Sequence, residues 1–303
     1  AGPTPKAAEH NAHQDLAYAR MVFSRLLNLT DPEGPHQAAA PTFERQKWMD
    51  MLLNLAPFPV VNSKLGPVFA EAVTFTEPQP APESNAGYPI VHFAAMHPAA
   101  VIGPDSSHEL QTLAWNTMLL NNIATDFGGG SGAVLAWPSA SRLAQRKDAQ
   151  ALLTNFTRAF KRQVLPNGWP NDGGGGLESI GGLEALHLLM LRGDDALRIF
   201  PAWPEGAPAR FRDLRAPGAF LVSARWNGTQ VVAPVSITSL AGRLLVLETP
   251  WAGWSICAIT GQSPPKHLIP VEDWPNRYRL KTEKGIQYDL KPCKSAAVVT
   301  EYV

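Results

Sequence analysis

Apolar residues in the first two-thirds of the chain recur at intervals of three and four, which is the spacing of an amphipathic α-helix. Between Asp15 and Leu29, for example, Leu16, Ala19 and Phe23 fall on one helical face. Prolines and glycine runs end such segments and separate them from one another. The pattern predicts helices over residues 15–29, 43–55, 106–124, 133–145, 149–164 and 178–191.

The pattern changes from about Ala196, where prolines, glycines, β-branched and aromatic residues take over. Stretches of strand-forming residues flank Asn227-Gly228, a dipeptide typical of a tight β-hairpin. We expect further strands in RLLVLE, WSICAIT and IQYDL. The chain is therefore predicted to be α then β, with a helical domain over residues 1–200 and a β domain over residues 201–303. The proline-rich residues 56–105 are expected to be irregular.

The charge balance narrows the classes of partner. The chain has 303 residues, and its 26 lysines and arginines match its 26 aspartates and glutamates, so the formal net charge is zero. Nucleic acids and anionic membranes attract proteins with a basic surplus, and we expect neither as a partner. No apolar run approaches the roughly 20 residues of a membrane-spanning helix. The opening Ala1-Gly2-Pro3 lacks a starter methionine, so we expect a processed chain or part of a longer one.

The two cysteines, Cys257 and Cys293, both lie in the predicted β domain. They can form a disulfide or remain two unrelated thiols, and the sequence favours neither. No group of cysteines and histidines has the spacing of a zinc site, so we expect no metal and no cofactor. Three N-x-S/T sequons, at Asn28, Asn155 and Asn227, give weak support for a secretory route and N-glycosylation.

Two loop segments are candidates for chemistry. Trp169-Pro170-Asn171-Asp172 precedes four glycines, and a glycine run lets the backbone approach a ligand closely. Asp172 is either a catalytic carboxylate or part of a flexible surface loop. His92 and His97 either orient a substrate or water, or belong to a turn with partly buried histidines. Loop carboxylates, histidines and tryptophans are typical of carbohydrate sites, where indole faces stack on sugar rings.

Several segments also stand in a recognisable order. A histidine-containing turn ends in proline and leads to a helix in VHFAAMHPAAVIGPDSSHELQTLAWNTM, and a tryptophan-containing helix follows in GSGAVLAWPSASRLAQ. A glycine-rich turn then opens a helix in NDGGGGLESIGGLEALHLLM. A segment that leads into the first strands follows in ALRIFPAWPEGAPARFRDLRAPGAFLVSARWNG, and the last strands follow in SITSLAGRLLVL and LKTEKGIQYDL. This series, over roughly residues 15–290, resembles the C-terminal half of glycoside hydrolase family 95, the α-L-fucosidase and α-L-galactosidase family.

The resemblance implies a partial (α/α)6 barrel, with about half of its helices, followed by an antiparallel β-sandwich-like domain. It places the family's base-assisting aspartate at Asp172, the histidine of its substrate pocket at His92 and a barrel tryptophan at Trp137. The family's general acid, a glutamate, would fall at Glu9, where the Ser-Pro of its motif is missing. A solvated N-terminal residue is the alternative role for Glu9. The family's arginine before the histidine is Val91 here.

The resemblance therefore implies inverting hydrolysis of α-L-fucosyl or related linkages of a glycan or polysaccharide by a secreted protein. Asp172 would polarise the attacking water, and Glu9 would protonate the leaving oxygen. The substrate-binding residues are expected to be His92, His97, Trp137, Trp169 and Asn171. Because only about half of a barrel is predicted, we also expect an N-terminal companion chain or segment.

Two other functions stay open at this stage. One is a non-catalytic carbohydrate-binding or structural extracellular protein that keeps the hydrolase fold. The other is phosphorolysis or lyase chemistry on an (α/α) barrel, which would need an anion site or a tyrosine base near Asp172.

Overall fold

The computed structural model describes residues 11–30, 41–77, 93–120, 131–162 and 177–294, and the chain divides into two compact units. The helical unit comprises Ala1–Leu143 and Leu152–Ala185. The β unit comprises Ala144–Ala151 and Leu186–Val303.

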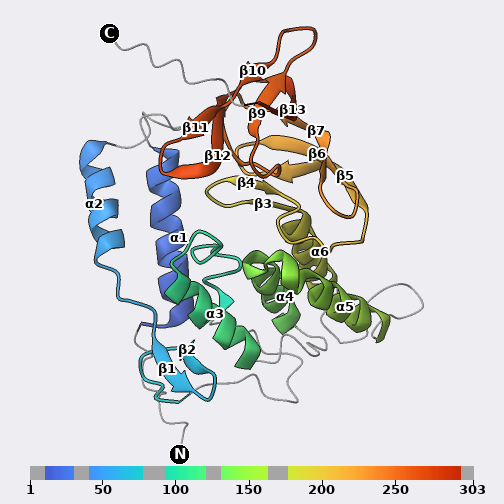
Figure 1. Ribbon diagram of the computed structural model, residues 1–303. Coiled ribbons are helices and arrows are strands. Elements are labelled where there is room, and N and C mark those ends of the chain that lie inside the picture. The colour runs from blue at the N-terminus through green and yellow to red at the C-terminus, as the bar shows by residue number, and fades with distance from the viewer. Residues whose placement is uncertain (1–10, 31–40, 78–92, 121–130, 163–176, 295–303) are drawn as a thin grey trace, which may run out of the picture. The chain divides into compact units, whose positions relative to one another are not determined.

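Six helices are found in the described residues, and each overlaps one of the six predicted from the sequence. The order of helices first and strands later confirms the prediction of α then β (Figure 1). None of the described helices combines the length and apolar character that a membrane crossing requires. The helices are α1 (His13–Leu29), α2 (Thr42–Leu53), α3 (His108–Leu120), α4 (Ser131–Leu143), α5 (Arg146–Arg162) and α6 (Leu177–Met190).

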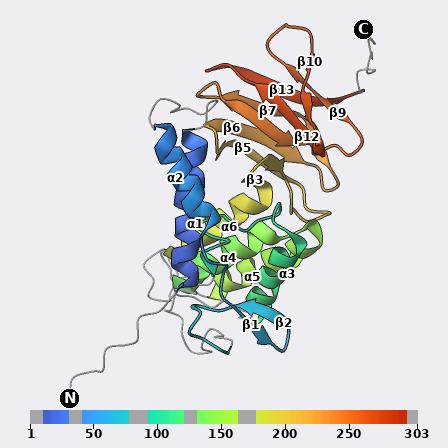
Figure 2. The same cartoon turned by 90° about the vertical axis from the view of Figure 1, so that its left-hand side faces the viewer.

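The first two helices lie side by side (Figures 1 and 2), and the Arg45 side chain of α2 bonds to the end of α1. Carbonyl groups in the last turn of a helix have no partner within the helix. The Thr30 hydroxyl donates to the Leu26 carbonyl at 2.6 Å, and the Arg45 guanidinium of α2 donates to the Leu27 carbonyl at 2.8 Å. The Arg45 guanidinium also donates to the Thr30 hydroxyl. Helix α1 therefore ends where a side chain of α2 can donate hydrogen bonds to its last turn.

The start of α3 differs in detail from the prediction. The sequence pattern predicted a helix from residue 106, but α3 begins at His108. The Ser107 hydroxyl accepts the Leu110 backbone N–H at 3.3 Å, which makes Ser107 the capping residue. Ser106 instead accepts the Gly103 N–H at 3.1 Å and closes the preceding turn.

The proline-rich segment expected to be irregular contains a short antiparallel hairpin of β1 (Val60–Ser63) and β2 (Gly66–Phe69). Gly66 has a φ of +96°, a backbone conformation that other residues rarely adopt. The Thr117 hydroxyl of α3 accepts the Phe69 N–H at 2.9 Å, which attaches the hairpin to the helix. The expectation of an irregular segment was therefore wrong for these residues.

The β unit consists of two sheets whose inner faces share one hydrophobic core (Figure 2). The six-stranded sheet has the order β10-β9-β13-β7-β6-β5, and the five-stranded sheet has the order β11-β12-β8-β4-β3. Neighbouring strands are antiparallel except for β4 and β8. The strands are β3 (Leu191–Gly193), β4 (Leu197–Ile199), β5 (Ala209–Ala216), β6 (Phe220–Trp226), β7 (Val231–Ser239), β8 (Leu244–Glu248), β9 (Ser255–Ile259), β10 (Lys266–His267), β11 (Ile269–Val271), β12 (Trp274–Lys281) and β13 (Gln287–Cys293).

The strands predicted from the sequence are confirmed. The β6–β7 hairpin turns at Asn227-Gly228, where the Asn227 side chain accepts the backbone N–H groups of Thr229 and Gln230 at 2.9 Å. The three other predicted segments form β8, β9 and β13. Strands β3 and β4 precede residue 201, where the sequence placed the start of the β domain, yet they belong to the five-stranded sheet.

A row of ionic side chains crosses the outer face of the five-stranded sheet. Arg198 on β4 and Arg277 on β12 are buried, and both approach the half-buried carboxylate of Glu248 on β8. The Glu248 Oε2 lies 3.0 Å from the Arg198 Nε and 3.8 Å from the Arg277 Nε. The Arg277 guanidinium also lies 3.7 Å from the ring centre of Trp274. Glu248 is thus a shared counter-charge for two buried cations.

Replacing Glu248 by glutamine is expected to lower the free energy of unfolding by about 2 kcal/mol, because two buried guanidinium groups lose a common carboxylate. Urea unfolding at neutral pH measures the loss. Glu272→Gln, at an exposed position between β11 and β12, is the matched control and should change the unfolding free energy by less than about 0.5 kcal/mol. Equal values for the two variants would contradict the assigned role of Glu248.

Candidate functional site

Most of the site residues predicted from the sequence cannot be compared with the structure. Five of the seven lie outside the described residues: Glu9, His92, Trp169, Asn171 and Asp172. The other two, His97 and Trp137, belong to the helical unit. The described part of the candidate site is therefore built around His97.

His97 sits at the end of a tightly hydrogen-bonded turn. The Phe93 carbonyl accepts the N–H groups of Met96 at 2.9 Å and His97 at 3.0 Å, and the His97–Pro98 peptide bond is cis. Residues 93–96 are almost completely buried. The Ser139 hydroxyl of α4 lies 3.5 Å from the Phe93 carbonyl. This packing fixes the backbone from which the imidazole of His97 projects.

Charged side chains from three helices interact with one another, and one of them, Arg142, acts on His97. Arg142 on α4 is buried, Glu184 on α6 is half-buried and Arg25 on α1 is exposed. Burial lowers the pKa of the Arg142 guanidinium to about 10; the Glu184 carboxylate opposes this shift and Arg25 adds to it. Burial, and then the charge of Arg142, lower the pKa of His97 to about 4. We refer to His97, Arg142, Glu184 and Arg25 as the His97 cluster.

The His97 cluster offers the hydrogen-bonding groups that a polyhydroxylated ligand needs. Since the pKa of His97 is well below 7, its imidazole is neutral near neutral pH and can both donate and accept a proton in hydrogen bonds. Arg142 stays charged, and its guanidinium has donors only, whereas the oxygen atoms of the Glu184 carboxylate are acceptors. Sugar hydroxyls donate and accept, so this combination suits a carbohydrate. The neutral imidazole is also suited to hold a water molecule.

The lowered pKa of His97 predicts a specific loss of stability in acid. Between about pH 6.5 and pH 4 the unfolded chain binds a proton at His97 that the folded chain does not, so the free energy of unfolding falls as the pH is lowered through this range. The fall should be smaller in His97→Gln than in the wild type, as measured by urea unfolding between pH 7 and pH 4. The exposed His108→Gln variant should follow the wild type. Parallel wild-type and His97→Gln curves would show that the imidazole is not buried in its neutral form.

Trp137 packs inside the helical unit. It lies on α4 with only 4% of its surface exposed, and its ring centre is 5.2 Å from that of Phe156 on α5. Stacking on a sugar would need an accessible indole face. In this structure Trp137 packs α4 against α5, and its expected role in substrate binding stays a prediction.

Arg142 and Glu184 are members of the His97 cluster that the sequence interpretation missed. Each carries a charge on a helix that is otherwise largely apolar, in WPSASRL and in GGLEALHLLM. A charged residue in such a setting is rarely buried without a partner or a function. That contrast is the signal in the sequence that could have identified both residues.

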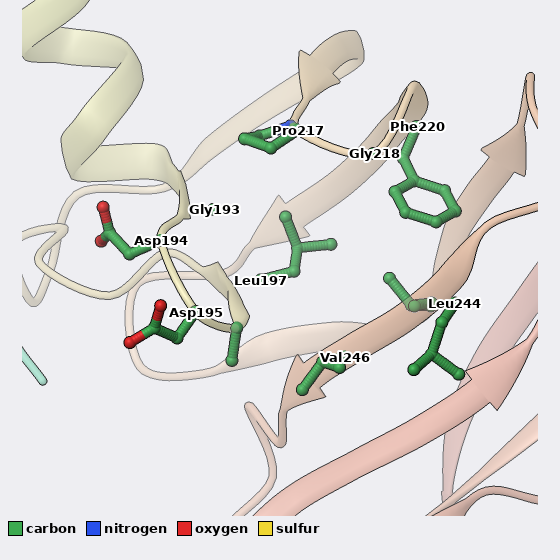
Figure 3. A pocket seen from close by; sticks show the side chains of 11 residues that line it. Gly193, Asp194, Asp195, Leu197, Pro217, Gly218, Phe220, Leu244 and Val246 are labelled. Atoms are coloured by element: carbon green, nitrogen blue, oxygen red, sulfur yellow. The ribbon is translucent and has the colours of Figure 1, made fainter. Parts of the chain in front are cut away.

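A small pocket of about 180 Å³ lies in the β unit (Figure 3). The carboxylates of Asp194 and Asp195 lie on one side, and Phe220 and Leu244 lie on the other. Asp194 interacts with Arg198, whose Nη1 lies 4.0 Å from its Oδ2. No histidine, lysine or arginine is among the described residues that line the pocket.

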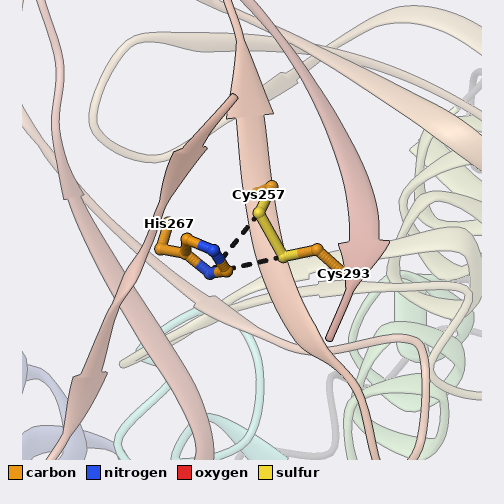
Figure 4. Close-up of side chains that lie close together, drawn as sticks. All are labelled: Cys257, His267 and Cys293. Carbon is orange, nitrogen blue, oxygen red and sulfur yellow. Dashed lines mark hydrogen bonds between the residues drawn. A yellow bond between two sulfur atoms is a disulfide. The ribbon is translucent and has the colours of Figure 1, made fainter. Parts of the chain in front are cut away.

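The two cysteines left open by the sequence form a disulfide between β9 and β13 (Figure 4). The Nδ1 of His267 on β10 lies 3.5 Å from each sulfur atom. Among the described residues, one group of side chains has ligand atoms close enough together to hold a metal ion: Cys257, His267 and Cys293. The sequence did not suggest this group, because sheet pairing rather than spacing brings its members together.

Comparison with known proteins gives no assignment: the chain matches no family model and no curated protein.

Proposed function

We propose that this chain is the C-terminal portion of a secreted, inverting glycoside hydrolase, similar to family 95, that acts on α-L-fucosyl or related linkages of a glycan or polysaccharide. The ordered series of segments described under Sequence analysis carries the proposal. In the described residues this series corresponds to the turn at residues 93–98, then α3, α4 and α6, and then β4 to β13. The His97 cluster adds a set of donors and acceptors suited to sugar hydroxyls.

In this proposal the six helices are about half of an (α/α)6 barrel, and an N-terminal companion chain or segment supplies the other half. Exposed apolar side chains on the first two helices support this part of the proposal. Phe43 is 70% exposed and Leu53 is 76% exposed, and Met49 and Met51 beside them are exposed as well. Helix α2 has no buried residue, which is unusual for a helix of a folded domain and suits a surface that packs against further helices.

The proposed chemistry needs two carboxyl groups on opposite sides of the scissile bond. A glutamic acid, for which Glu9 is the candidate in this chain, protonates the leaving oxygen, while Asp172 polarises the water that attacks the opposite face. In inverting enzymes the two carboxyl groups are about 6.5–9.5 Å apart, which leaves room for that water. His97 binds sugar hydroxyls together with His92, Trp137, Trp169 and Asn171, and the charge of Arg142 acts on His97.

The disulfide supports the secreted location, because disulfides persist mainly in oxidising compartments. Of the three sequons, Asn28 on α1 and Asn227 in the β6–β7 turn are exposed, whereas Asn155 on α5 is half-buried. In a secreted protein, Asn28 and Asn227 are therefore the better candidates for N-glycosylation.

The test is incubation of the complete enzyme with aryl α-L-fucoside and α-L-galactoside, with sugar release and ligand binding measured on the same preparation. The proposal expects release of L-fucose or L-galactose. Binding without release would favour the non-catalytic carbohydrate-binding alternative, and neither binding nor release would overturn both.

A further inference from the structure

Cys257, His267 and Cys293 lie together because the pairing of three neighbouring strands places them on one face of a sheet. His267 on β10 is directly opposite Cys257 on β9. On the other side of β9, Cys257 is opposite Lys291, and Cys293 lies two residues further along β13. Since side chains alternate between faces every residue, all three project from the same face.

That face is the outer face of the six-stranded sheet. The neighbours of Cys257 on β9, Ile256 and Ala258, belong to the shared hydrophobic core, so Cys257 points away from it. Cys257 is nevertheless only 2% exposed, whereas His267 is exposed and Cys293 is partly exposed. The three side chains thus form a small cluster (Figure 4), in which Cys257 is covered and His267 is exposed.

The spacing of the three ligand atoms fits a tetrahedral metal ion. With metal–sulfur and metal–nitrogen bonds of about 2.3 Å and 2.0–2.1 Å, tetrahedral geometry requires a sulfur–nitrogen separation of about 3.5 Å. The His267 Nδ1 lies 3.5 Å from both sulfur atoms. After reduction the two sulfurs are no longer bonded and move apart, towards the separation of about 3.8 Å that two thiolates on one zinc ion need.

We propose that, when its disulfide is reduced, the chain binds a zinc ion through Cys257, Cys293 and His267. Thiolate and imidazole ligands select soft or borderline ions such as Zn²⁺ over Mg²⁺ or Ca²⁺. Three protein ligands leave a fourth position for water or another ligand, and the exposed side of the cluster gives access to it.

The disulfide and the zinc site exclude each other, so the site is controlled by the redox state. Two molecules of a small thiol reduce the disulfide to two protein thiols and are themselves joined as a disulfide. Zinc then binds as both thiols release their protons, and the neutral His267 contributes the lone pair of Nδ1. In an oxidising compartment the disulfide forms and the site closes. This inference is independent of the proposed glycosidase function.

The test is titration of the full chain with Co²⁺ and then Zn²⁺, after reduction with a phosphine and removal of metals. The reduced chain should bind one Co²⁺ with thiolate-to-cobalt charge-transfer absorption, and Zn²⁺ should displace it. The oxidised chain should show no such band. His267→Ala should weaken Zn²⁺ binding at least about tenfold, and His108→Ala, which removes an exposed histidine from α3, should not.

Circular dichroism recorded during the titration shows whether the reduced chain keeps its fold. A reduced chain that is unfolded with and without Zn²⁺ overturns the proposal. So does a folded reduced chain that binds no stoichiometric metal, or equal Zn²⁺ affinity for His267→Ala and the wild type. Sugar hydrolysis is not a readout, so failure of the zinc site leaves the proposed glycosidase function untouched.

Discussion

Replacing Asp172 by asparagine in the complete enzyme is expected to lower kcat for an α-L-fucoside or α-L-galactoside by about a thousandfold. General-base catalysis contributes about 10²–10⁴-fold to the rate, and it depends here on Asp172 as the base-assisting carboxylate. Asparagine is close to aspartate in size but cannot polarise the attacking water as a carboxylate does. The change should therefore leave KM nearly unaffected. Steady-state kinetics on an aryl glycoside measures both constants.

Asp273→Asn is the matched control for this experiment. It makes the same chemical change at an exposed position between β11 and β12 and should leave kcat at the wild-type value. If Asp172→Asn hydrolysed the substrate at the wild-type rate, the role assigned to Asp172 would be wrong. An equal loss in both variants would point to an effect on folding.

The second large effect is expected from Trp226→Ala, which should lower the free energy of unfolding by about 4 kcal/mol. Trp226 on β6 is only 1% exposed, and its ring centre lies 6.0 Å from that of Phe200. Its indole N–H donates to the Pro204 carbonyl at 3.2 Å, and the Arg146 guanidinium lies 4.6 Å from the ring centre. Alanine removes all of these contacts and leaves a cavity in the core.

Trp254→Ala is the matched control, because Trp254 belongs to the same unit but is 47% exposed. Its removal should cost less than about 1 kcal/mol, since surface substitutions change stability little. Denaturant unfolding monitored by circular dichroism compares the two variants. Similar losses would contradict the assignment of Trp226 to the core shared by the two sheets.

The elements with strong local signals could be predicted from the sequence. The helices have a repeated apolar spacing, and Asn227-Gly228 favours the turn between β6 and β7. The β1–β2 hairpin was missed because Pro59 and Pro67 made its segment resemble a loop. Strands such as β4 and β10 are only three and two residues long, so they carry too few positions to show a period.

The sequence could point to a residue of the candidate site only where a chemically suitable side chain also stands in an unusual local sequence. His97 stands out in a short histidine- and proline-containing turn, and the structure packs that turn firmly. Arg142 and Glu184 come from different helices, and only folding brings Arg142 near His97 and Glu184 near Arg142. The partners of His267 likewise depend on strand register, which the sequence does not specify for a two-residue strand.

The configuration of the first sugar released by the complete enzyme tests the proposed function most directly. Proton NMR during hydrolysis of an α-L-fucoside or α-L-galactoside distinguishes the two anomers before they equilibrate. Inverting hydrolysis predicts that the β anomer forms first. Initial formation of the α anomer, or the absence of hydrolysis, would contradict an inverting glycosidase.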